Sequence, residues 1–532
     1  MIRFLAVIVV LACAVVARAA PPDLVFQLAA GESDEKVAAL NTLVVEADDS
    51  VPPLLQAFLG GNVQFSPSEK RVFIVADGKG SDAVTGKPVS ELPADLEDVV
   101  VNNRLRRELD GGIAALKLVA SDPATRLAAA AALQGTLEES RLPIIERALE
   151  KETDPRIKGL LELTRAAIQV RSADPETRLA AVRTLGESSN PATKTVLLSI
   201  VEKTGDTFVE PNTEVRAAAE RSLRSVERRL ATGERIGQIF SGISLGSILL
   251  LAALGLAITY GLMGVINMAH GELMMIGAYA TYVVQNLFRS FAPELFDFYL
   301  AAAVPVSFAV SAAVGMVLER VVIRHLYGRP LETLLATWGI SLILIQTVRT
   351  IFGAQNVQVE NPVWMSGGLA IMTDVVLPWS RVIIIGFALV VLLAVWLVLT
   401  RIRLGLFVRA VTQNRAMASC VGVRTGKIDM WAFGLGSGLA GLAGCALSQV
   451  GNVGPDLGQS YIVDSFLVVV LGGVGQLAGT VYAAFGLGIV NKFLEGWAGA
   501  VVAKIAVLLF IIVFIQRRPQ GLFALKGRTA DA

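Results

Sequence analysis

The chain has 532 residues, of which 54% are hydrophobic and only 17% charged, and its formal net charge is +1. Because soluble proteins average about 25% charged residues, this composition indicates a chain that lies largely in lipid. The balanced charge excludes the basic excess that nucleic-acid binding needs. Two histidines and three cysteines without zinc-ligand spacing predict no metal site, and no motif predicts a cofactor.

Residues 1–19 have the three parts of a secretory signal peptide. Arg3 supplies the positive start, residues 4–16 the apolar stretch, and residues 17–19 the small-x-small cleavage site. The apolar stretch of about 13 residues is roughly 20 Å long as a helix, short of a ~30 Å hydrocarbon core. The alternative of an uncleaved first span is therefore disfavoured. Cleavage before Ala20 would place the following residues outside the cytoplasm.

Residues 20–232 are typical of a soluble, mostly helical domain, which the signal peptide would export to the periplasm. Four helix starts have an Asp or Asn beside a proline, and an Ala/Leu stripe at helical spacing follows each of them. We expect HEAT-type helical hairpins, which must stack because one pair cannot bury its own apolar face. A non-repetitive helical bundle remains the alternative, because the starts are irregularly spaced at Pro123, Pro155, Pro175 and Pro211.

Residues 63–103 interrupt the helical pattern. Their β-branched residues around Asp-Gly and Thr-Gly turns predict a small β insertion. Gly80, Gly86 and Lys87 resemble part of a phosphate-binding loop, but Pro88 stands where a Ser or Thr would hold magnesium. We therefore predict no nucleotide site, no catalytic residues and no enzymatic activity in this chain.

Nine apolar segments follow between residues 236 and 523, which predicts an all-α, polytopic membrane domain with about nine spans. The seventh is short, so a broken helix or re-entrant pair, and a total of eight or ten, stay open. Arginines cluster after the third, fifth and last segments, so the positive-inside rule makes those loops and the tail at 524–532 cytoplasmic. The soluble domain then lies outside, in agreement with the signal peptide. The segments are 239–260, 263–287, 298–319, 331–352, 381–400, 427–449, 461–474, 477–494 and 499–516.

Three polar residues, Asn267, His270 and Glu272, surround Gly271 in the second apolar segment. Ionisable groups are costly in lipid and usually face a cavity or a partner. The cluster therefore predicts a hydrogen-bonded contact between helices, a substrate pathway or a proton relay. Closely spaced glycines later in the chain predict tight helix packing. These are Gly434, Gly438, Gly441, Gly475 and Gly479.

Two motifs resemble the permease subunits of ABC importers for branched-chain amino acids. The first is INMAHGE at residues 266–272, and the second is LGLFVRAVTQNRAMASCVGV at residues 404–423. The resemblance implies a permease domain at 236–523 that works with a periplasmic binding protein, a second homologous permease and two cytoplasmic ATPases. It also implies that the second motif contacts the ATPase through a segment that contains Arg409, Ala410, Asn414, Arg415, Ala416 and Gly422.

The exported front domain distinguishes the chain from ordinary members of that family. With DAVTGKP at residues 82–88 and VNNRLRR at residues 101–107, it resembles the urea permeases of the group, the Urt-type B subunits. This resemblance implies uptake of urea or short amides across a bacterial inner membrane. The alternative substrates are branched-chain or other amino acids.

The candidate pathway combines the polar cluster with a later hydroxyl. Urea is uncharged and has both donors and acceptors, so its pathway needs amide or hydroxyl groups and few charges. Asn267 and Thr337 suit this chemistry, and His270 and Glu272 complete the set of candidate residues. A rival function, a stand-alone channel or proton-coupled carrier, would use His270 and Glu272 as a proton pair.

Overall fold

A computed structural model describes most of the chain. The predicted signal peptide at 1–19 and the predicted cytoplasmic tail at 524–532 lie outside the described residues. The chain divides into two compact units, Met1–Leu230 and Ala231–Ala532. The described residues are 21–46, 51–76, 79–89, 92–118, 120–134, 139–204, 207–264, 267–372 and 375–523.

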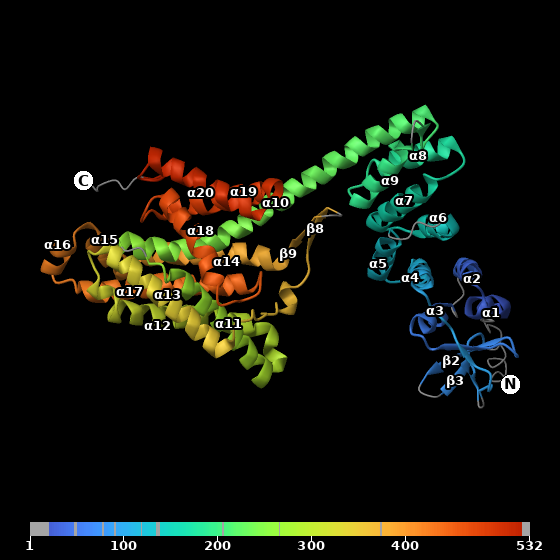
Figure 1. Ribbon diagram of the computed structural model, residues 1–532, viewed down its shortest axis with the longest axis horizontal. Coiled ribbons are helices and arrows are strands. Elements are labelled where there is room, and N and C mark those ends of the chain that lie inside the picture. The colour runs from blue at the N-terminus through green and yellow to red at the C-terminus, as the bar shows by residue number, and fades with distance from the viewer. Residues whose placement is uncertain are drawn as a thin grey trace, which may run out of the picture. The chain divides into compact units, whose positions relative to one another are not determined.

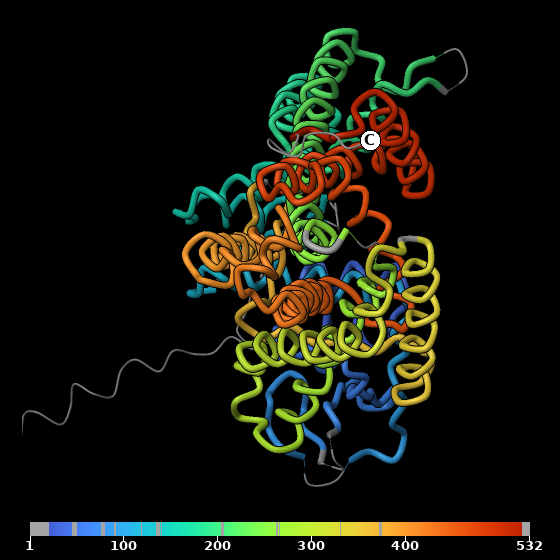
Figure 2. The backbone as a smooth tube through the Cα atoms, turned by 90° about the vertical axis from the view of Figure 1, so that its left-hand side faces the viewer, coloured from blue at the N-terminus to red at the C-terminus, as the bar shows by residue number. Residues whose placement is uncertain are grey.

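The first unit consists mainly of short helices (Figures 1 and 2). Asp122, Asp154 and Asp174 each accept hydrogen bonds from backbone N–H groups in the first turn of the helix that follows. The predicted Asp-Pro helix starts are thus confirmed. The helices are α1 (Pro22–Ala30), α2 (Ser33–Glu46), α3 (Val51–Leu59), α4 (Asn103–Lys117), α5 (Pro123–Leu133), α6 (Leu142–Lys151), α7 (Pro155–Gln169), α8 (Pro175–Leu185), α9 (Pro191–Val201) and the start of α10 (Thr213–Met263).

One hydrogen-bond arrangement occurs twice among these helices. Arg126 Nε donates to Glu152 Oε2 at 2.9 Å, and Arg178 Nε donates to Glu210 Oε2 at 2.8 Å. Each arginine also donates to two backbone carbonyl groups just before its own helix. The paired side chains are largely buried, and each pair ties a helix to the segment just before a later helix, α5 to the start of α7 and α8 to the start of α10. The HEAT-type repeat itself stays a prediction.

The β insertion near 63–103 is a five-stranded antiparallel sheet in the order β4-β3-β2-β1-β5. Asp82 stabilises the turn between β3 and β4, because it accepts hydrogen bonds from Thr85 N at 2.8 Å and from Arg71 Nη2 at 2.6 Å. The unit is therefore helical with a small sheet. The strands are β1 (Val63–Ser66), β2 (Arg71–Ala76), β3 (Lys79–Asp82), β4 (Pro88–Val89) and β5 (Glu97–Asp98).

Seven helices, among the described residues, are long and apolar enough to cross a membrane. The prediction of about nine spans is corrected in two places. α11 (His270–Phe291) carries buried polar side chains and does not qualify, and α18 (Leu457–Gly472) has only 16 residues. The short seventh segment is the 16-residue helix α18, which residues 473–476 separate from the helix that follows. The seven are α10, α12 (Tyr299–Val321), α13 (Pro330–Phe352), α14 (Trp379–Arg401), α17 (Thr425–Ser448), α19 (Leu477–Ala498) and α20 (Ala500–Arg517).

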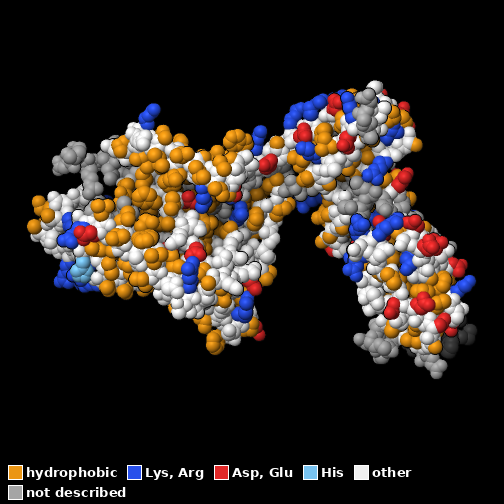
Figure 3. Space-filling view, in the orientation of Figure 1, with side chains coloured by type: hydrophobic (Ala, Val, Ile, Leu, Met, Phe, Trp, Pro, Cys, Tyr) orange, Lys and Arg blue, Asp and Glu red, His pale blue; other side chains and the backbone are white. Residues whose placement is uncertain are grey.

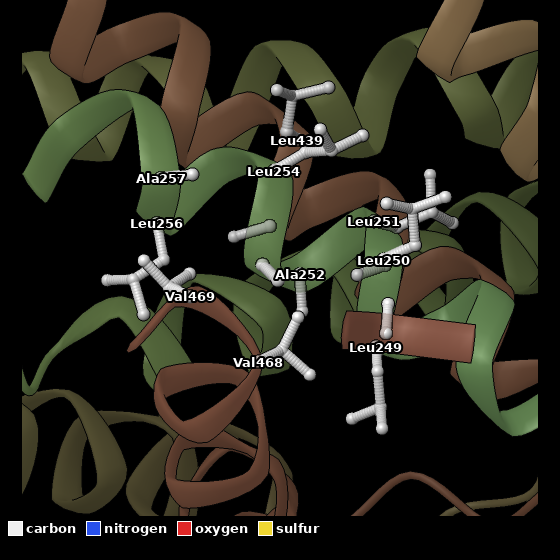
Figure 4. Close-up of a cluster of buried hydrophobic side chains, with 14 of the residues drawn as sticks. Leu249, Leu250, Leu251, Ala252, Leu254, Leu256, Ala257, Leu439, Val468 and Val469 are labelled. Carbon is white, nitrogen blue, oxygen red and sulfur yellow. The ribbon is translucent and has the colours of Figure 1, made fainter. Parts of the chain in front are cut away.

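The core of the second unit lies around α10 and α17. The most apolar windows of these two helices are 72% and 83% buried, against 22% for α14 and 17% for α20. Figure 4 shows Leu254 of α10 beside Leu439 of α17, and Ala252 and Leu256 of α10 near Val468 and Val469 of α18. The outer helices expose apolar side chains, many of which are visible on the face of this unit in Figure 3. Exposed apolar side chains of this kind are expected where helices contact the lipid of a membrane.

Candidate functional site

The predicted polar cluster lies in the link between α10 and α11 and in the first turn of α11. α10 ends at Met263 and α11 begins at His270, so a helix break interrupts the second apolar segment. His270 Nε2 lies 3.0 Å from the carbonyl oxygen of Ala252, a residue 11 positions before Met263. At 1.5 Å per residue, α11 therefore begins about 16 Å back from the end of α10, roughly half the thickness of a hydrocarbon core.

A second helix begins at the same place. Gly458, in the first turn of α18, packs against Gly271, in the first turn of α11. A Cβ atom on either glycine would collide with the carbonyl group of the other. Within the described residues, neither helix has a side chain that caps its first turn. Two helix N-termini, each with a positive partial charge, thus meet inside the second unit.

Hydroxyl groups of α13 line this meeting point. Glu272 Oε1 accepts a 2.6 Å hydrogen bond from Ser341 Oγ, and Thr337 Oγ1 accepts a 3.2 Å hydrogen bond from Met268 N. All four polar side chains, including that of neighbouring Asn267, are buried. The structure therefore brings Asn267, Glu272 and Thr337 into one site. Sequence reasoning missed Ser341, although hydroxyl residues four apart on an apolar helix could have indicated it.

His270 belongs to a different contact. Its ring faces α10 at Ala252 and Gly255, whereas Glu272 faces α13. Residues two apart on a helix are rotated by about 200° around its axis, so their side chains point to nearly opposite faces. The side chains of His270 and Glu272 therefore do not form a pair. The proton relay between them thus loses its geometric basis. Three buried atoms of the cluster have no hydrogen-bond partner in the described part of the chain: Asn267 Nδ2, His270 Nδ1 and Glu272 Oε2.

The predicted packing glycines lie at contacts of two kinds. Gly434, Gly438 and Gly441 of α17 all pack against α12, where a Cβ atom would collide with side chains or backbone. Gly479 of α19 packs against the backbone of α18. Gly475 does not lie in a helix, contrary to the prediction, but in the link between α18 and α19 with φ of +78°. This link adjoins the end of α10, so it lies beside the break between α10 and α11.

The second motif forms two short helices between α14 and α17. They are α15 (Arg403–Gln413) and α16 (Arg415–Cys420). Asn414 separates them and caps α16, because its Oδ1 accepts a 2.9 Å hydrogen bond from Met417 N. Gly422 ends the segment with φ of +88°, a conformation that other residues rarely adopt. The motif therefore forms two short helices joined at Asn414 and is not an irregular loop.

Arg409 joins α15 to the end of α14. Its Nη1 donates a 2.8 Å hydrogen bond to the carbonyl oxygen of Leu399. Arg409 also borders a cavity of about 340 Å³, which is lined mainly by apolar side chains of α10, α14 and α15 and by the link after α18. The two predicted alanines differ, since Ala410 is half-buried and Ala416 is exposed.

Arg415 links the same segment to two membrane helices. It forms an ion pair with Asp429 of α17, whose side chain is fully buried. Its guanidinium carbon lies 4.7 Å from the ring centroid of Tyr327, and Tyr327 Oη donates a 3.0 Å hydrogen bond to Glu319 Oε1 of α12. Sequence reasoning missed Asp429 and Tyr327, because nothing in their local sequence marks them as contacts of Arg415.

The described residues contain no group of three or more His, Cys, Asp or Glu side chains that could hold a metal ion. Two free cysteines are described, Cys420 at the surface and Cys445 in the core. The site is therefore built from amide, hydroxyl and carboxylate groups, which suit reversible binding of a polar solute.

Comparisons with known proteins place this site within a matched region. The family described as "Branched-chain amino acid transport system / permease component" matches residues 238–516. The chain is 28% identical over 291 residues to the high-affinity branched-chain amino acid transport system permease protein BraD of Pseudomonas aeruginosa, covering 54% of this chain and 94% of BraD. It is 27% identical over 291 residues to LivH of Escherichia coli K12, with the same coverage of 54% and 94%. A probable LivH of Methanocaldococcus jannaschii is 25% identical over 291 residues, covering 52% and 88%. No solved structure gives a significant match.

Proposed function

The chain belongs to the family of branched-chain amino acid transport system permease components, and from this membership we propose that it carries branched-chain amino acids across the membrane. It is the permease component of an ABC transporter and not itself an enzyme. The observation that carries the proposal is the buried site of Asn267, Glu272 and Thr337 at a helix break inside the matched region. Polar groups at such breaks in membrane proteins typically contact the transported solute.

The proposed assembly contains a second homologous permease, two cytoplasmic ATPases and a periplasmic binding protein in a bacterial inner membrane. Met417 and Val421 support an ATPase contact at the second motif, because both are strongly exposed apolar residues on or just after α16. The arginine-rich loops support a cytoplasmic position for this segment. The first unit then lies in the periplasm.

Uptake of labelled leucine, isoleucine and valine tests the proposed substrate. Deletion of the gene is expected to abolish high-affinity uptake of at least one of them, and expression of this chain should restore it. Vesicles that contain this chain alone are expected to transport none, because partner subunits supply the ATP hydrolysis. Uptake by such vesicles would instead identify a stand-alone channel or carrier.

Urea is the second candidate substrate, and the first unit favours it. This unit lies outside the region that the relatives match. Of its two urea-permease motifs, one forms the turn between β3 and β4 at Asp82, and the other starts α4, where Asn102 caps the helix. The names of the relatives favour amino acids over urea. Lost growth on low urea after gene deletion would support urea, and normal growth with lost leucine uptake would exclude it.

The helices of the first unit are proposed to form HEAT-type hairpins. The support is the recurrence of the Arg–Glu ion pair, since Arg126 and Arg178 lie 52 positions apart and make equivalent contacts. A stack of hairpins presents an extended surface, which suits contact with another subunit of the importer.

A further inference from the structure

We propose that Glu272 binds the ammonium group of the transported amino acid and that Asn267 binds its carboxylate. The inference rests on the proposed function, because it assigns the binding atoms of the same pathway. It implies selectivity for solutes with a charged amine over uncharged amides such as urea.

Glu272 has the position and the unused atom that this role requires. Its side chain is 1% exposed, and only Oε1 is occupied, by the 2.6 Å hydrogen bond from Ser341 Oγ. Oε2 has no partner among the described residues and faces α18, because a Cβ atom on Gly458 would lie 2.5 Å from it. Leaving a buried carboxylate oxygen unpaired costs free energy. A charge-assisted hydrogen bond from an ammonium group would offset that cost.

Asn267 supplies the complementary donor. Its Oδ1 accepts a 3.0 Å hydrogen bond from Ala269 N, while Nδ2 is buried without a partner in the described chain. The segment with Asn267 contacts α13 at Thr337, and Glu272 contacts it at Ser341, four residues or about 6 Å further along the helix. An α-amino acid carries both charged groups on one carbon, so it is short enough to reach both side chains.

Access to this site requires α11 and α18 to separate. In the present conformation the backbones of Gly271 and Gly458 are in contact and close the site. The other end of α18 is bounded by Gly473 and Gly475, whose φ values are +97° and +78°. Glycines in this conformation provide hinge positions at the end of a moving helix.

Equilibrium binding of tritiated leucine to the importer, purified without its binding protein, tests the assignment. Unlabelled leucine is expected to displace the label at least about tenfold better than 4-methylpentanoate, which lacks the amine, or urea. Glu272→Gln should weaken leucine binding about tenfold or more and abolish the preference over 4-methylpentanoate. Ser341→Ala, which removes only the group that orients Glu272, should weaken leucine binding by a smaller factor.

Glu319→Gln is the matched control. Glu319 is also 1% exposed, and its Oε1 likewise accepts a hydroxyl hydrogen bond while its Oε2 has no partner in the described residues. Because it lies beside the second motif and not at the helix break, leucine affinity should be unchanged. Equal loss in both glutamate variants, or normal binding by Glu272→Gln, would overturn the ammonium site. An importer that takes up urea but no amino acid would overturn the proposed function instead.

Discussion

Asp429 has a fully buried carboxylate, and Arg415 is the cation that pairs with it. A buried acceptor that loses its partner costs about 1–3 kcal/mol, so Arg415→Ala should lower the free energy of unfolding by that amount. The six tryptophans all follow residue 330, so tryptophan fluorescence during thermal unfolding in detergent reports on the second unit and measures this loss.

A double variant that removes both charges distinguishes the cost of leaving Asp429 unpaired from the cost of losing the other contacts of Arg415. The double variant Arg415→Gln with Asp429→Asn should recover most of the stability, because no buried charge is left unpaired. A double variant as unstable as Arg415→Ala would show that the cost comes from other contacts of Arg415, such as its approach to Tyr327.

The contact between α11 and α18 leaves no room for a side chain. Gly458→Ala should destabilise the second unit by about 1–3 kcal/mol, because a Cβ atom meets the backbone of Gly271. It should also abolish leucine uptake. Gly486→Ala on α19 is the matched control, because a Cβ atom there meets nothing within 4 Å. Equal effects of both substitutions would mean that general helix flexibility, not this contact, matters.

The two helices of the second motif should couple ATP hydrolysis to transport. Arg409→Ala removes the hydrogen bond that holds α15 to the end of α14, so leucine uptake should fall strongly while the amount of protein in the membrane stays normal. Arg403→Ala changes another exposed arginine of α15 and should retain uptake. Normal transport by Arg409→Ala would count against the coupling role.

The orientation of the whole chain can be read from its own cysteines. Cys420 is exposed on α16, and Cys445 is buried in α17. A membrane-impermeant thiol reagent should label Cys420 in inside-out vesicles but not in spheroplasts, because the arginine-rich loops are expected to be cytoplasmic. Cys420→Ser should remove this labelling. Labelling in spheroplasts would reverse the orientation and place the first unit in the cytosol.

The stability of the first unit should depend on pH through its buried ion pairs. The hydrogen bond from Arg126 lowers the pKa of Glu152 below its ordinary value of 4.5, although burial opposes the shift. A lowered pKa contributes stability above the ordinary value, and this contribution is lost as the pH falls through the folded-state pKa. Hydrogen exchange of α5 and α7, corrected for intrinsic rates, should therefore accelerate below about pH 4.5. Glu152→Gln should weaken this dependence.

Features that depend on neighbouring residues were predictable from the sequence. Asp122 and Asp174 cap helices because each carboxylate accepts hydrogen bonds from the next backbone N–H groups, while the proline fits the first turn. The long apolar helix α14 follows from hydropathy alone. Family membership was predicted from the motifs at residues 266–272 and 404–423, and the comparisons confirm it. The cap acts within the first turn of its helix, and the hydropathy that predicts α14 lies within that helix.

Features that depend on packing were decided only by the tertiary structure. Ser341 reaches Glu272 across 69 positions, and Gly458 meets Gly271 from a helix too short to be a span. The hairpin of β8 (Gly368–Met372) and β9 (Val375–Pro378) was likewise not predicted. Hydropathy cannot locate the start of α11, because the apolar residues before it continue the pattern through the break. The sequence alone determined which segments are apolar and where helices are capped, and the packing of separate helices determined which polar atoms meet.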